Sequence, residues 1–169
     1  MINLKLIYKI IGSLLFIEAM MLLVCLGVSV YYHEDDLLAF VCSIAISAGT
    51  ALVLRLFARN CDNNLSRRDA YLVVTLTWVV FSLFGTLPFL IGGYLHSFTD
   101  AFFETMSGFT TTGASIIDDV DALPHGILFW RSFTQWIGGL GIVFFTIALL
   151  PSLVGGSVKV FAAEATGPI

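Results

Sequence analysis

The sequence predicts an all-α membrane protein with four transmembrane helices and one short re-entrant helix followed by a loop. Three observations support this fold class: an apolar composition, four long apolar runs, and an alternation of charge between them. Hydrophobic residues make up 58% of the 169 residues and charged residues only 12%, with a mean hydropathy of +0.95. Because a soluble domain of this length needs a polar surface, the composition favours the membrane as solvent.

Each apolar run is long enough to cross a bilayer, which takes roughly 20 residues. The runs are Ile10–Val30, Leu37–Leu54, Ala70–Leu95 and Ser132–Val158. We interpret the first run as an uncleaved helix, because its apolar stretch is too long for a signal peptide. Glu18 interrupts that run, and a carboxylate inside the membrane is costly. It is expected either to hydrogen-bond to a neighbouring helix or to serve ion or partner coupling.

The charges between the runs predict the orientation. Basic residues precede the first run, separate the second from the third and follow the fourth, whereas the other two connections are acidic. Basic loops mark the cytoplasmic side, so the N-terminus is expected in the cytoplasm. The net charge of −4 and the lack of a basic stripe argue against nucleic acid as a partner.

The connection between the third and fourth runs carries the functional signal. Residues 97–109 have helical apolar spacing but are too short to span, and residues 110–115 form a run of Thr, Gly, Ala and Ser. Such a loop at membrane depth must be buried in protein or line water. There its carbonyl oxygens can replace the hydration shell of a cation, and Gly113 can take a positive φ. The alternative is an exposed polar turn, since these are common turn residues.

Two motifs carry a family resemblance. Met106–Ser115 reads MSGFTTTGAS, and Trp136–Val143 reads WIGGLGIV. Together and in this order they resemble the first pore repeat of the Trk/Ktr bacterial potassium-uptake family, most closely its Trk-type membrane subunit. Members of that family resemble four fused helix–pore loop–helix repeats, the architecture of tetrameric cation channels. This chain contains one repeat, so the resemblance implies an N-terminal portion of a longer protein or a truncated product.

The resemblance implies a division of the chain and a filter. Residues 1–69 would form a two-helix membrane unit with a cytoplasmic loop, residues 70–158 the first repeat, and residues 159–169 a cytoplasmic tail or the start of the next segment. The pore helix would be 97–109. One quarter of the selectivity filter would consist of the backbone carbonyls of Thr110, Thr111 and Thr112 with Gly113, and potassium would bind at Thr111 and Thr112.

Structural support for this loop is expected from the last run. Arg131 near its outer end needs an acidic partner, and Asp100, Glu104 and Asp118 are the candidates. Small residues permit close helix packing in membranes. They are Gly138, Gly139 and Gly141, which could alternatively provide a hinge.

By this resemblance the chain takes part in potassium uptake across the bacterial cytoplasmic membrane, as a channel or symporter and not as an enzyme, with no cofactor. The implied partners are the remaining repeats or identical copies, and a cytoplasmic nucleotide-binding regulatory subunit. Another monovalent cation channel and a non-conducting scaffold remain open. An intramembrane hydrolase using Ser107 or Ser115 with His125 is disfavoured, because the G-x-S-x-G elbow is absent.

Overall fold

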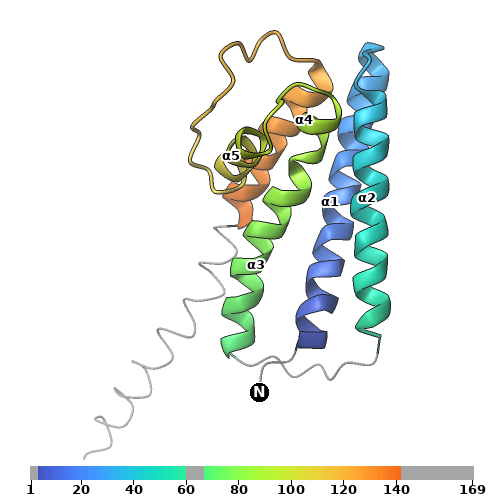
Figure 1. The fold of residues 1–169 in the computed structure, drawn as a ribbon, viewed down its shortest axis with the longest axis vertical. Coiled ribbons are helices and arrows are strands. Elements are labelled where there is room, and N and C mark those ends of the chain that lie inside the picture. Colours follow the sequence, from blue (N-terminus) through green and yellow to red (C-terminus); the bar gives the residue numbers. More distant parts are fainter. Residues whose placement is uncertain (1–3, 60–66, 142–169) are drawn as a thin grey trace, which may run out of the picture.

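The computed structural model describes residues 4–59 and 67–141, and within these ranges the regular structure is entirely helical. Figure 1 shows the arrangement. The labelled helices are α1 (Leu4–Tyr32), α2 (Leu37–Phe57), α3 (Arg67–Gly85), α4 (Leu87–Ile91) and α5 (Phe98–Phe109). A further helical segment occupies 125–141.

Three helical stretches in the described ranges are long and apolar enough to cross a membrane: Leu4–Tyr32, Leu37–Phe57 and Tyr71–Ile91. They correspond to the first three predicted runs. The fourth predicted run, Ser132–Val158, begins inside the segment 125–141, but its remainder and residues 159–169 lie outside the described residues.

The first two helices form an antiparallel hairpin (Figure 1). With 29 residues, α1 is about 44 Å long, enough for the hydrocarbon core and the headgroup regions. The turn is tight: His33 has φ +57°, and Asp36 precedes α2. The buried carboxylate of Asp36 accepts a hydrogen bond from the Ser29 hydroxyl, so the two helices are joined by side chains as well as by the chain.

A break divides the third apolar run. Helix α3 ends at Gly85, and α4 begins at Leu87 after the single residue Thr86. Pro88 lies in the first turn of α4, where the missing N–H of proline costs no helical hydrogen bond. The carbonyl of Gly85 accepts a hydrogen bond of 3.0 Å from the Trp130 indole N–H. This bond satisfies a helix-terminal carbonyl and fastens α3 to the segment 125–141.

The buried side chains form two clusters. The larger one joins all the elements around Phe40, Phe89, Phe109 and Trp130, and the smaller joins α1, α2 and α3 around Leu15. Many large apolar side chains on α1 and α2 are exposed, as expected for helices that face lipid or further protein.

Candidate functional site

Helix α5 is held at its C-terminal end by aromatic packing. Its 12 residues make it about 18 Å long, too short to span a bilayer. The buried ring of Phe109 lies 5.4 Å from the ring centre of Phe81 on α3 and 6.2 Å from that of Trp130. The last residue of α5 is therefore enclosed between α3 and the segment 125–141.

The end of α5 packs against Gly138, far along the segment 125–141. A Cβ added to Gly138 would stand 2.1 Å from the carbonyl oxygen of Phe109, and one added to Gly139 would stand 3.8 Å from the Thr111 methyl group. Gly138 follows His125 by 13 residues (138 − 125), which is about 20 Å along a helix. The chain between α4 and the segment 125–141 thus descends by about 20 Å and returns.

The loop after α5 is turned by two residues with left-handed backbone. Thr111 has φ +56° and Gly113 has φ +75°. The N–H groups of Thr110, Thr111 and Thr112 point back to the helix and donate to Met106, Gly108 and Ser107 at 2.9, 2.9 and 3.0 Å. Among the described residues, the carbonyl oxygens of Thr110, Thr111 and Thr112 accept no hydrogen bond. Three successive backbone oxygens thus lack a donor within the ranges 4–59 and 67–141.

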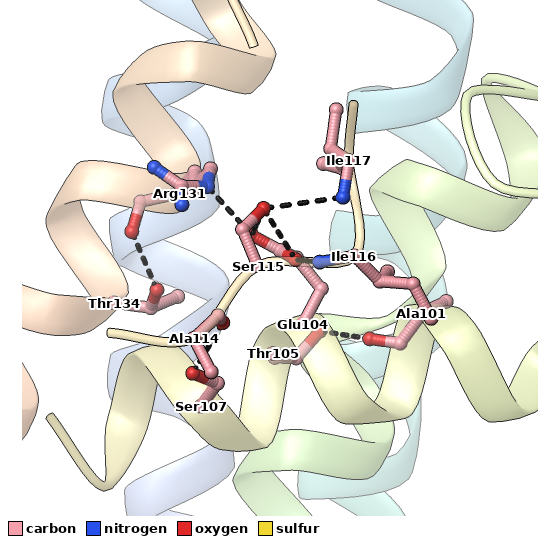
Figure 2. Close-up of polar contacts among 10 residues, drawn as sticks. All are labelled: Ala101, Glu104, Thr105, Ser107, Ala114, Ser115, Ile116, Ile117, Arg131 and Thr134. Atoms are coloured by element: carbon pink, nitrogen blue, oxygen red, sulfur yellow. Dashed lines mark hydrogen bonds and ion pairs between the residues drawn. The ribbon is translucent and has the colours of Figure 1, made fainter. Parts of the chain in front are cut away.

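A polar network holds the loop to its surroundings (Figure 2). Ser107 donates from its hydroxyl to the carbonyl of Ala114 at 2.6 Å. The buried carboxylate of Glu104 accepts from the Ser115 hydroxyl at 3.0 and 3.1 Å and from the Ile116 N–H at 3.0 Å. Arg131 donates from Nε to the same carboxylate at 2.6 Å. Glu104 thus links α5, the returning loop and the segment 125–141.

The wall behind the loop is formed by neighbouring residues of that segment. A Cβ on Gly108 would lie 2.4 Å from the Thr134 hydroxyl oxygen, so only glycine fits there without a shift. At Gly113 the nearest atom to such a Cβ is Nε2 of Gln135, at 3.7 Å. A side chain at Gly108 would therefore collide with its neighbour, whereas a side chain at Gly113 would have space.

A second polar contact lies at the start of the segment 125–141. Glu34 accepts from the backbone N–H of His125 at 2.7 Å and lies 2.8 Å from its Nδ1, and the His125 ring stacks on Tyr32 at 3.9 Å. Desolvation alone would raise the pKa of Glu34, but the hydrogen bonds and charge of His125 outweigh it, and the pKa lies below its ordinary value. A carboxylate at a helix N-terminus also offsets the helix dipole.

The structure brings most of the predicted site residues together. Thr110, Thr111, Thr112 and Gly113 share one loop. Of the three acidic candidates, Glu104 is the partner of Arg131. The predicted glycine face is uneven: Gly138 touches the end of α5, whereas a Cβ on Gly141 would only reach ordinary contact with Trp78 at 3.5 Å.

The expected hydrogen bond of Glu18 is not found among the described residues, and the sequence analysis missed several contacts. Glu18 makes no hydrogen bond to a neighbouring helix within the part of the chain that the structure describes. Sequence reasoning did not single out Gln135 or Glu34. No local pattern reveals the contact between Glu34 and His125, which are 91 positions apart. The anchoring role of Ser107 was also missed, although its place inside the MSGF motif was a usable signal.

Comparison with known proteins identifies the family. Residues 37–169 match the TrkH family, described as a cation transport protein. The chain belongs to the TrkH family. The resemblance drawn from the two motifs is thereby confirmed, and the family is one of cation transport proteins and not of enzymes. Among the described residues, the hydroxyls of Ser107 and Ser115 donate to Ala114 and Glu104, and His125 contacts Glu34, so neither serine is paired with His125.

The similar proteins are potassium-uptake proteins by name. The chain is 38% identical over 168 residues to "Trk system potassium uptake protein TrkH" of Halomonas elongata, covering 99% of this chain and 35% of that protein. It is 35% identical over 164 residues to the protein of the same name from Escherichia coli, covering 96% and 34%. The chain therefore spans about a third of the length of these TrkH relatives.

A solved TrkH structure shares the fold. The crystal structure of the potassium transporter TrkH from Vibrio parahaemolyticus matches with a TM-score of 0.82 and 38% identity, covering 88% of this chain and 32% of that one. The all-helical arrangement described above is thus that of a TrkH transporter over the matched region.

Proposed function

We propose that this chain forms the first pore repeat of a protein that takes up potassium across the bacterial cytoplasmic membrane. Thr110–Gly113 supplies one quarter of its carbonyl-lined selectivity filter, with potassium at Thr111 and Thr112. The conformation and position of the turn after α5 are the main support for this proposal. The carbonyls of Thr110, Thr111 and Thr112 accept no hydrogen bond from described residues, and the turn lies about 20 Å along the neighbouring helix.

The chemistry follows from the exposed oxygens. Carbonyl oxygens replace the hydration shell of potassium when several loops surround one axis. The C-terminal end of α5 adds partial negative charge beside the turn, which favours a cation there. An inside-negative potential then drives each ion inward with about 2.3 kcal/mol per 100 mV.

In this proposal α5 is the pore helix and Glu104 is its brace. The Glu104–Arg131 ion pair, with the bonds from Ser115 and Ile116, fixes the part of the loop that follows the turn. Gly138 lets the segment 125–141 approach the backbone at Phe109. Both features hold the carbonyls in place before an ion arrives.

One loop cannot enclose an ion, so the pore requires further repeats or copies of this chain. The loop residues from Thr112 to Ser115 are exposed in the single chain, whereas irregular backbone at membrane depth must be covered by protein or line water. The greater length of the TrkH relatives supports further repeats in the same polypeptide. The isolated chain would then be a non-conducting membrane scaffold.

The surroundings of the pore are also proposals. The N-terminus, the end of α2 with Arg55 and the following connection with Arg59 would face the cytoplasm, where a nucleotide-binding regulatory subunit would dock. The acidic loops would face outward. The divisions at 1–69, 70–158 and 159–169 follow the same scheme. A filter with a single glycine leaves another monovalent cation as the second candidate substrate.

Growth at limiting potassium tests the proposal. The complete gene should rescue a strain that lacks potassium uptake. Gly113→Val should abolish rescue or admit sodium, because a left-handed valine is strained by about 1–3 kcal/mol and distorts the filter. Gly93→Val is the matched control: Gly93 has φ +72° and open space around it but lies outside the loop. Normal growth and selectivity with Gly113→Val would refute the placement of the filter.

A further inference from the structure

The interface between α1 and α2 contains two buried polar side chains that play no part in the proposed filter. Glu18 lies at the middle of α1 and Ser47 at the middle of α2, and both are 0% exposed. Neither carboxylate oxygen of Glu18, nor the hydroxyl oxygen of Ser47, has a hydrogen-bond partner in the described ranges 4–59 and 67–141.

The pairing of the hairpin places these two residues at the same depth. Toward the turn, Ser29 of α1 bonds to Asp36, and toward the other end a Cβ on Gly12 would lie 3.0 Å from the carbonyl oxygen of Ala51. On α1, Glu18 lies between Gly12 and Ser29. On α2, Ser47 lies between Asp36 and Ala51. In an antiparallel pair the two residues are then level to within about one helical turn of 5.4 Å.

Comparable polar side chains elsewhere in the described chain do have hydrogen-bond partners. Buried Glu104 has an arginine and two further donors. On α2, the hydroxyls of Ser43 and Thr50 donate to carbonyls of their own helix at 2.6 and 2.8 Å. Ser47 makes no such bond within the described chain.

An ionised Glu18 is energetically unfavourable in this place. A charged side chain at the centre of a spanning helix costs about 2.5–3.5 kcal/mol even on the mildest scale. A neutral carboxylic acid avoids that cost but still has one donor and one acceptor to satisfy. A water molecule with two to four polar partners is the usual solution in protein interiors.

We propose that Glu18 is a protonated carboxylic acid that forms, with Ser47, a buried site for one water molecule at the centre of the α1–α2 interface. The acid O–H donates to the water oxygen, and the water donates to the Ser47 hydroxyl oxygen and to the acid carbonyl. Polar bridges of this kind hold membrane helices in register. The site lies in the N-terminal hairpin and stands independently of the filter.

Infrared difference spectroscopy on the complete protein in lipid vesicles at about pH 8 tests the site, because exposed carboxyls are then ionised. Wild type minus Glu18→Gln should show the carbonyl stretch of a protonated acid. Ser47→Ala should shift that band to higher frequency, because a hydrogen bond is lost. Thr50→Ala, whose hydroxyl is bonded to Ile46, should leave it in place. A water O–H band sensitive to ¹⁸O-water should disappear in Ser47→Ala.

Three results would overturn the proposal. Carboxylate bands in the Glu18→Gln difference would show an ionised side chain. An acid band that Ser47→Ala and Thr50→Ala affect equally would remove Ser47 from the site, and an acid band without a water band would remove the water. If Glu18→Gln does not fold, the two hydroxyl variants still decide the matter, because both retain Glu18.

Discussion

At the scale of single residues, the loop keeps a backbone conformation that its sequence makes costly. Thr111 has φ +56°, and a β-branched residue in that region is strained by about 1–3 kcal/mol. The N–H bonds of Thr111 and Thr112 to Gly108 and Ser107 maintain the turn. Within the described residues, the carbonyls of Thr110, Thr111 and Thr112 accept no hydrogen bond, which the proposed filter requires.

Gly138 provides the sharpest test at this scale. Gly138→Ala would place a methyl group 2.1 Å from the carbonyl oxygen of Phe109, so α5 or the segment 125–141 must shift. We expect a cost of about 1–3 kcal/mol from overpacking, seen as a lower melting temperature, together with reduced potassium uptake. Gly139→Ala is the matched control, because its methyl group would reach only ordinary contact at 3.8 Å. Equal effects of the two changes would contradict this close approach.

At the scale of elements, α5 owes its position to groups distant in sequence. Phe109 packs between α3 and the segment 125–141, and Glu104 collects donors from the returning loop and from Arg131. The charge pair lies beside the Thr–Gly turn and not within it. The described contacts therefore support the loop on the side of α5 and the segment 125–141, and none of them occupies the carbonyls of Thr110, Thr111 and Thr112.

Removing the charge of Glu104 should loosen this support. Breaking a buried ion pair costs about 3–5 kcal/mol, and the cost here should fall below that range because Arg131 is 26% exposed. Glu104→Gln should therefore lower the melting temperature and weaken discrimination between potassium and sodium. Asp100→Asn, on the same helix but outside the network, is the control. Adding Arg131→Gln to Glu104→Gln should recover part of the stability, and failure to recover any would contradict a direct coupling.

The sequence predicted those features that depend on local pattern. Apolar run length located α1, α2 and α3, helical spacing located α5, and the resemblance of MSGFTTTGAS located the loop. Gly113 was expected to take a positive φ, but Thr111 was not, because its side chain disfavours it. The choice of Glu104 over Asp100 and the contact between Glu34 and His125 depend on tertiary packing, which a single sequence does not encode in any local period.

At the scale of the whole molecule, the described chain consists of the α1–α2 hairpin and a second group of helices, α3, α4, α5 and the segment 125–141, which contact each other through both buried clusters and near the hairpin turn. The larger buried cluster joins them through Phe40, Phe81 and Trp130. At the end near the hairpin turn, Glu34 binds the first residue of the segment 125–141. The hairpin thus contacts the helix that carries Arg131 and Gly138, and it can steady the wall behind the loop.

The Glu34 contact should make stability depend on pH. The pKa of Glu34 is lowered below its ordinary value in the folded chain, so its charge contributes stability above the ordinary pKa, and the contribution is lost as pH falls through the lower folded pKa. Glu34→Gln should therefore reduce the melting temperature at about pH 6, and the difference from wild type should shrink on acidification. Asp35→Asn, at an exposed neighbouring carboxylate, should not reproduce this pattern. A difference that is constant across this range would contradict the account.

In the proposed pore, the turn after α5 presents its backbone oxygens to a dehydrated cation, and anomalous diffraction from the complete protein with bound rubidium or thallium would locate that cation. We predict an ion on the pore axis in direct contact with the carbonyl oxygens of Thr111 and Thr112, with equivalent loops around it. Ion density located elsewhere, with these carbonyls turned away from the axis, would contradict it.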